Sequence, residues 1–218
     1  FAVGRTQEIV YSLNRMISEG ELPPMPVYVD SPLAINATEI FRKYSHYLDD
    51  ETHEFMRIGE HPALTFPGLS YTHSVEESKA INYSETPSVI IAASGMCEAG
   101  RILHHLVHNI EDERNTICIV SWQAPHTLGR RLVEKQPIVK IFGEEVPLKA
   151  EVATINGLSA HAGQDMLVKY AASAANEHLK EIYLVHGDAE AAASLLEKLH
   201  GIGFNNVHYP ERMEVAEL

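Results

Sequence analysis

The chain has little cysteine, no long apolar run and a deficit of positive charge. Its 218 residues include two cysteines, Cys97 and Cys118, which form neither a metal-binding pair nor a disulfide framework. No apolar run approaches the roughly 20 residues of a membrane span, and no charged start followed by a short apolar segment marks secretion. The sequence therefore predicts a reduced, cytoplasmic protein without a membrane partner.

The charge balance limits how the chain could bind nucleic acid. It has 17 Lys and Arg against 30 Asp and Glu, a net charge of −13, which argues against a general basic surface. Six basic residues do gather in the middle of the sequence and could line a local groove, although solvated charges on helix surfaces are an alternative for each of them. They are Arg101, Arg114, Arg130, Arg131, Lys135 and Lys140.

Apolar runs typical of strands alternate with helical patterns along most of the chain. This alternation predicts an α/β protein with a mostly parallel, Rossmann-like sheet covered by helices. A helix ending near Gly20 comes first, and Ser74 with Glu77 forms a capping box for a further helix. The expected strands are 27–29, 88–93, 116–121 and 138–142, and the expected helices between them include 33–44, 101–109 and 128–134.

The pattern changes around Gly143, where a hairpin of 138–142 with 146–155 replaces the longer strand and helix units. We therefore place a domain boundary there, giving predicted domains at 1–142 and 143–218. The second ends with a helix at 189–199 and a strand at 207–209.

Two histidines follow apolar segments near the C-terminal end. His161 closes Gly157-Leu158-Ser159-Ala160-His161, and His186 lies in Leu184-Val185-His186-Gly187. One helix, 164–175, and one strand, 182–185, fit between them. Both side chains are then expected at the carboxyl-end edge of the sheet, where α/β proteins bind their ligands, so they could share a metal or phosphate site. The alternative is that each is a hydrogen-bonded structural histidine.

These motifs, in this order, resemble the metallo-β-lactamase/β-CASP nucleases, which include ribonuclease J and the endonuclease subunit of the cleavage and polyadenylation machinery. Ser-Ala-His and Val-His-Gly match the family, as do Ser94-Gly95-Met96 followed by Gly100-Arg101, Val27 to Ala34, and Glu144 to Ala150. The similarity covers nearly the whole chain. It implies a β-CASP domain followed by the C-terminal part of a metallo-β-lactamase αββα domain of the RNA-metabolising type.

The resemblance also implies roles for particular residues. His186 corresponds to a zinc ligand of the family's dinuclear site, whose two zinc ions hold a bridging hydroxide as the nucleophile. His161 corresponds to the histidine that contacts the scissile phosphate and donates a proton to the leaving oxygen. Ser94, Gly95 and Arg101 are expected to contact the RNA backbone. Ser159 either hydrogen-bonds a phosphate oxygen or is a turn residue.

One departure from the family pattern affects all these roles. The His-x-His-x-Asp-His motif and the acidic partner of His161 lie upstream in the family and are missing here. Because the chain starts at Phe1 without an initiator methionine, it is interpreted as the C-terminal part of a larger enzyme. We expect this fragment to bind zinc weakly or not at all, and to be inactive by itself.

Three functions stay open on these grounds. The first is a zinc-dependent ribonuclease, with RNA favoured over DNA because DNA-directed members are the minority. The second is a non-catalytic RNA-processing scaffold, as in family members that lost metal ligands. The third, hydrolysis of a small ester or lactam, is less compatible with a large insertion across the cleft. Homodimer formation is also open, because many relatives dimerise through C-terminal parts.

Three other features are given structural roles. His104 and His108 have the i, i+4 spacing of a metal pair, but position 105 is histidine where the metalloprotease pattern needs glutamate, so a helix face is expected. Asp30 is expected to hydrogen-bond the turn that it starts. Trp122 could stack on a base, yet a buried or half-buried aromatic is the commoner outcome.

Overall fold

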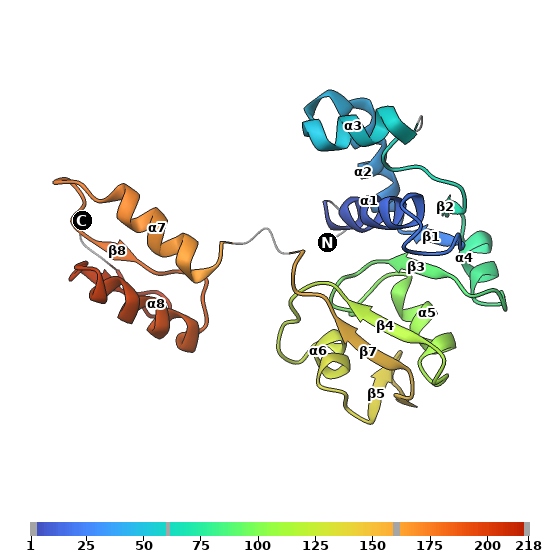
Figure 1. Cartoon of the computed structure of the whole chain (residues 1–218). Coiled ribbons are helices and arrows are strands. Elements are labelled where there is room, and N and C mark those ends of the chain that lie inside the picture. The colour runs from blue at the N-terminus through green and yellow to red at the C-terminus, as the bar shows by residue number, and fades with distance from the viewer. Residues whose placement is uncertain (1–3, 60–61, 159–161, 216–218) are drawn as a thin grey trace. The chain divides into compact units, whose positions relative to one another are not determined.

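The computed structural model describes residues 4–59, 62–158 and 162–215. The chain forms two compact units, Phe1–Ser159 and Ala160–Leu218. Figure 1 shows them in the colour order of the sequence, with the first unit from blue to orange and the second from orange to red. Each unit is described by itself.

A three-stranded parallel sheet forms one half of the first unit. Strand β1 (Val27–Asp30) lies between β2 (Leu69–Tyr71) and β3 (Val89–Ala92), and both neighbours run parallel to it. Val27 and Val29 are fully buried, as expected for a central parallel strand covered on both faces. The predicted α/β architecture with mainly parallel strands is confirmed.

The second half of this unit contains another parallel pair and a hairpin. Strand β4 (Thr116–Ile119) pairs with β7 (Glu151–Thr154), and β5 (Ile138–Ile141) pairs with β6 (Glu144–Pro147) in antiparallel fashion. The two turn residues of the hairpin have positive φ values, 53° at Phe142 and 89° at Gly143, which is typical of a tight hairpin turn.

The predicted hairpin is therefore correct, but its second strand does not run continuously from 146 to 155. Strand β6 ends at Pro147, which has no N–H to continue a ladder, and the chain then pairs with β4 through β7. The first compact unit consequently extends beyond residue 142. The domains 1–142 and 143–218 were inferred from sequence pattern and family resemblance, and they stay a prediction.

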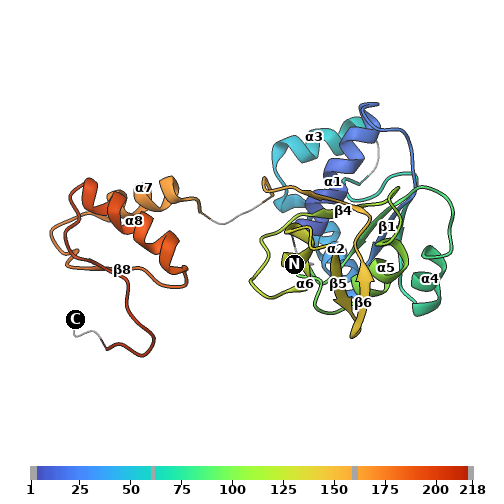
Figure 2. The same ribbon diagram turned by 90° about the horizontal axis from the view of Figure 1, so that it is seen from below.

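Helices cover these sheets and enclose two cores. Helices α1 and α2 pack with β1 around Val10, Val29 and Ile35, whereas α5 and α6 pack with β4, β5 and β7 around Ile110 and Leu132. Figures 1 and 2 show α1 and α2 beside β1. The helices of this unit are α1 (Arg5–Ser18), α2 (Pro32–Lys43), the short 3-10 helix η1 (Ser45–Tyr47), α3 (Asp50–Gly59), α4 (Val75–Ile81), α5 (Ile102–Asn109) and α6 (Leu128–Val133).

Most elements agree with the sequence expectations, including the capping box at Ser74 and Glu77. Three elements were not predicted, η1, α3 and β2. Helix α3 has no buried residue, and β2 is only three residues long.

The second unit has two helices and a short parallel strand pair. Its elements are α7 (Gln164–Ala174), β8 (Ile182–Tyr183), α8 (Ala189–Gly201) and β9 (Val207–His208). The helices pack side by side, as both views show. Ala171, Leu199 and Val207 are the buried apolar residues of its core. The predicted strand 182–185 is shorter than expected, since β8 ends at Tyr183.

In the described ranges, no helix has both the length and the apolar composition needed to cross a bilayer.

Candidate functional site

The loop between β3 and α5 contains Ser94 and Gly95 and is held by its own backbone. The Ser94 amide donates to the Ala99 carbonyl at 2.9 Å, and the Ser94 hydroxyl oxygen accepts from the Ala99 amide at 3.3 Å. Gly100 closes the loop with φ 86°, where an added Cβ would lie 2.4 Å from the Ala93 carbonyl oxygen. Only glycine fits this position without moving the backbone.

The first turn of α5 does not offer its amides to a ligand. The Ile102 amide donates to Ala93 at 3.1 Å, Leu103 to Gly100 at 3.3 Å and His104 to Arg101 at 3.0 Å. These three amides are therefore not free to bind a phosphate, because backbone carbonyls already accept hydrogen bonds from them. Within the described part of the chain, the amides of Gly95 and Met96 have no such acceptor.

The segment after β4 fastens the same loop from the other side. The Gln123 side-chain amide donates to the Gly95 carbonyl at 2.9 Å, and the Ser121 hydroxyl donates to it at 3.3 Å. The Gly129 amide donates to the Met96 carbonyl at 3.0 Å, and the Leu128 amide donates to the Glu98 carboxylate. The segments that follow β3 and β4 thus meet at the Gly95 carbonyl.

Gln123 is the buried centre of this attachment. Its side chain is 3% exposed, and its Oε1 atom has no hydrogen-bond partner among the described residues. That oxygen occupies the place of the missing side chain at Gly129, where an added Cβ would lie only 1.7 Å away. The Gln123 and Gly129 pair was not predicted from the sequence, because it depends on contact between two segments.

Asp30 is the centre of a second buried network beside the loop. It is 0% exposed, and its carboxylate accepts hydrogen bonds from Arg101 Nη1 at 2.5 Å and Ser78 Oγ at 2.5 Å. His105 Nε2 lies 2.7 Å from the same carboxylate. The expectation that Asp30 hydrogen-bonds its own turn is wrong, because Ser31 caps α2 while Asp30 points to α4 and α5.

His105 uses both ring nitrogens in this network. Its Nδ1 lies 2.7 Å from Asn82 Oδ1, so the ring bridges Asp30 and Asn82, and the residue is 4% exposed. Burial lowers the pKa of His105 below its ordinary value, although the Asp30 carboxylate opposes that shift. His104 and His108 lie on the exposed side of α5, as predicted for a helix face.

Arg101 was predicted to contact the RNA backbone, and the structure places it mainly inside the protein. Its side chain is 18% exposed, and besides Asp30 it donates to the carbonyls of Thr72 at 3.1 Å and His73 at 3.3 Å. A signal for this network was present in the sequence. Arg101 and His105 are four residues apart on one helix, and Asp30 ends a buried strand.

The basic residues of the central region form pairs that weaken the predicted groove. Besides Arg101, three of them lie near carboxylates, Arg114 with Asp112, Arg130 with Glu134 and Lys140 with Glu145. Arg131 instead donates to the His126 carbonyl at 3.2 Å.

In the second unit, His186 follows β8 and is exposed. It has φ 66°, a left-handed conformation that is uncommon for a residue other than glycine. Its neighbours are fixed, because the Gly187 carbonyl accepts from the Tyr209 hydroxyl at 2.9 Å and Asp188 caps α8. His161 and Ser159 lie outside the described residues, so a site shared by His161 and His186 stays a prediction.

The described residues do not make a zinc site by themselves. Zinc in proteins is held by at least three side chains, and no group of three His, Cys, Asp or Glu side chains converges in residues 4–59, 62–158 and 162–215. His186 is a single donor.

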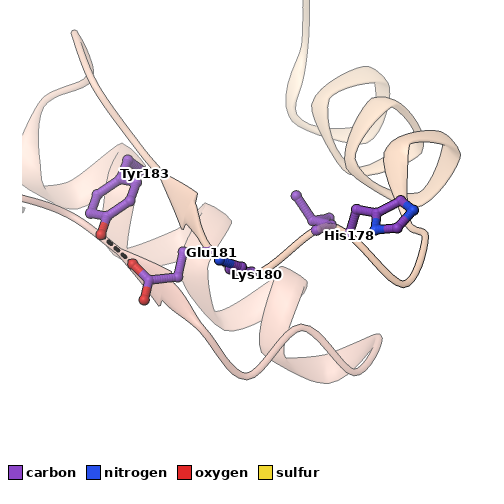
Figure 3. Close-up of a pocket in the computed structure, with 5 residues that line it drawn as sticks. His178, Lys180, Glu181 and Tyr183 are labelled. Atoms are coloured by element: carbon purple, nitrogen blue, oxygen red, sulfur yellow. Dashed lines mark hydrogen bonds between the residues drawn. The ribbon is translucent and has the colours of Figure 1, made fainter. Parts of the chain in front are cut away.

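The second unit also carries an open pocket of about 380 Å³. Figure 3 shows His178, Lys180, Glu181 and Tyr183 around it, with the Tyr183 hydroxyl bonded to the Glu181 carboxylate. This bond raises the pKa of Tyr183. None of the predicted site residues lines the pocket, and the sequence carried no signal for it.

Comparison with known proteins identifies the class. A family model described as the Beta-Casp domain matches residues 6–132, more than half of the chain. A second, described as the Zn-dependent metallo-hydrolase RNA specificity domain, matches residues 145–210. The chain therefore belongs to the metallo-β-lactamase/β-CASP nuclease family, and the resemblance found in its motifs is confirmed.

Individual relatives agree with this assignment. The chain is 39% identical to ribonuclease TTHA0252 from Thermus thermophilus over 196 residues, which cover 89% of this chain and 43% of that protein. It is 30% identical to transcription termination factor FttA from Methanocaldococcus jannaschii over 224 residues, 100% of this chain and 35% of the relative. An RNase J-like protein of the same organism is 29% identical over 170 residues, 78% of this chain and 38% of the relative. The chain thus spans less than half the length of each.

Proposed function

We propose that this chain supplies the RNA-binding β-CASP region and the last part of the catalytic domain of a zinc-dependent ribonuclease. The observation that carries the proposal is the order of the two family matches, a Beta-Casp domain followed by an RNA specificity domain. The relatives named above include a ribonuclease that matches across 89% of the chain. The longer protein containing this chain would hydrolyse RNA phosphodiester bonds in the cytoplasm.

The loop after β3 is the proposed contact with the RNA backbone. Its two adjacent amides, at Gly95 and Met96, are directed to no carbonyl of the described residues, and the Ser94 hydroxyl can still donate a hydrogen bond. Amides and hydroxyls of this kind bind phosphate oxygens without a net positive charge. This suits a chain whose net charge is −13. Ser159 is proposed as a further donor.

Arg101 is proposed to act in two ways. It holds Asp30 and the 72–73 backbone, which sets the position of α5 behind the loop. Its 18% exposed edge is proposed to contact the phosphate backbone. The positioning role rests on the hydrogen bonds to Asp30, Thr72 and His73, and the RNA contact rests on the family resemblance.

His161 and His186 are proposed as the chemical residues. A histidine titrates near neutral pH, so His161 can hold and release a proton at the leaving oxygen. The His186 imidazole is a suitable zinc ligand, and the two zinc ions, when bound, would supply a hydroxide nucleophile. The remaining ligands must come from outside the described residues, because a group of three donors does not form among them. This chain alone is therefore expected to bind zinc weakly and to lack activity.

The test compares His161→Ala and His186→Ala in the longer protein, with His200→Ala as the control because His200 is an exposed histidine on α8. Zinc content and the rate of cleavage of a single-stranded RNA are measured. We expect both site variants to lose nearly all cleavage, His186→Ala to lose zinc as well, and the control to keep both. Normal turnover in either site variant would contradict the assigned roles.

The second candidate is an RNA-processing scaffold without catalysis. The lack of a group of three His, Cys, Asp or Glu side chains in the described ranges fits this candidate. A longer protein that binds RNA but contains no zinc and cleaves nothing would support the scaffold and exclude the enzyme.

A further inference from the structure

Trp122 is exposed although a tryptophan is usually buried. It is 67% exposed, and it is the only tryptophan of the chain. The residues on either side are less exposed to solvent, since Ser121 is half-buried and Gln123 is buried. The ring of Trp122 is therefore exposed between two neighbours whose side chains are turned towards the protein.

The segment around Trp122 is held firmly. Gln123 Nε2 donates to the Gly95 carbonyl at 2.9 Å and to both the carbonyl and the hydroxyl oxygen of Ser121 at 3.0 Å. Arg5 donates to the Val120 carbonyl at 2.5 Å. The ring is therefore presented by a backbone that is fixed on both sides, so little conformational entropy would be lost when a ligand binds to it.

The same contacts place Trp122 beside the proposed RNA-contact loop. Its two neighbours in sequence both bond the carbonyl of Gly95, whose amide is one of the two without an acceptor in the described residues. An aromatic ring next to a phosphate-contact loop is the arrangement with which proteins hold single-stranded nucleic acid. Stacking needs no positive charge, so it adds affinity even in an acidic chain.

We propose that Trp122 is a stacking platform for one nucleobase of single-stranded RNA whose backbone is bound at Ser94 and Gly95. This inference rests on the proposed function, and it adds a base contact to the backbone contacts. Every base has a π-face, so the platform accepts different bases and rejects a duplex, in which the bases are already stacked. The alternative is that another protein segment, and not a nucleobase, packs on the Trp122 ring.

The test uses the 218-residue chain with single-stranded oligouridine and oligoadenosine RNA. Because Trp122 is the only tryptophan, all intrinsic tryptophan emission comes from this ring. We expect saturable quenching of that emission by both RNAs but not by duplex RNA. Trp122→Ala should weaken binding by about 5- to 150-fold, the equivalent of 1 to 3 kcal/mol per stacked base.

Two further variants make the test specific. Trp122→Phe keeps an aromatic face and should retain most of the affinity, whereas Tyr83→Ala removes an aromatic residue that is 77% exposed elsewhere on the same unit and should change nothing. The salt dependence of binding should be the same in Trp122→Ala and the wild type, because no phosphate contact is lost.

The outcomes separate the two proposals. Unchanged RNA affinity in Trp122→Ala, with the wild type still binding, would overturn the stacking platform and leave the proposed function standing. No binding of single-stranded RNA by the wild type would overturn both. A blue-shifted emission of Trp122 in the RNA-free chain, insensitive to added quencher, would show that protein covers the ring and would also overturn the platform.

Discussion

The strongest stability prediction concerns the ion pair of Arg101 and Asp30. Replacing Arg101 by methionine leaves a fully buried carboxylate with only Ser78 and His105 as partners. Removing one partner of a buried pair typically costs about 3 to 5 kcal/mol, a large part of the roughly 5 to 15 kcal/mol by which a protein of this kind is stable. Arg101→Met should therefore weaken the first unit severely.

Native-state hydrogen exchange measures this cost in the first unit alone. Amides of the central strand β1, such as Val29, exchange through global unfolding, so their rates should rise by about 150- to 5,000-fold. Arg114→Met is the matched control, because Arg114 pairs with Asp112 on the surface and its side chain is 88% exposed. An exposed pair of this type contributes about 1 kcal/mol or less, which corresponds to a rate change below roughly sixfold.

A double variant provides a second test in case Arg101→Met does not fold. Asp30→Asn with Arg101→Met removes the unpaired buried charge, so it should be more stable than Arg101→Met alone. The reasoning is refuted if Arg101→Met changes the exchange of β1 no more than Arg114→Met does, or if the double variant is the less stable of the two.

Two further predictions concern buried contacts around the loop. Gly129→Ala should destabilise the first unit by about 1 to 3 kcal/mol in urea unfolding, because the added Cβ would overlap Gln123 Oε1. Gly157→Ala is the control and should leave the stability unchanged, because the space around Gly157 is open. Equal effects of the two substitutions would contradict the packing argument. His105 should titrate below 6.5 in an NMR pH series, because burial lowers its pKa in the folded state. The unfolded chain then binds more protons, so this contribution to stability is complete above pH 6.5 and is lost as the pH falls through the lower folded pKa. A folded His105 pKa above 6.5 would reverse the sign.

The sequence by itself determined the class of fold and the family. Apolar periodicity located β1, β3, β4 and α5, because a buried strand or an amphipathic helix must repeat its apolar residues with its own period. Motifs such as Ser94-Gly95 and Val185-His186-Gly187 carried the family resemblance, because such motifs consist of residues adjacent in the sequence and can be recognised without a structure.

Only the tertiary structure decided which polar groups are used inside the protein. The sequence indicated Asp30 as a turn residue, Arg101 as an RNA contact, and Trp122 as more commonly buried or half-buried than stacked on a base. In the fold, Asp30 and Arg101 form an ion pair and Trp122 is exposed. These outcomes depend on contacts between segments far apart in the sequence, such as Gln123 with Gly95, 28 residues apart, and His105 with Asp30, 75 residues apart. The sequence shows the chemical type of each side chain, but the residue that this side chain contacts depends on how the backbone folds in three dimensions.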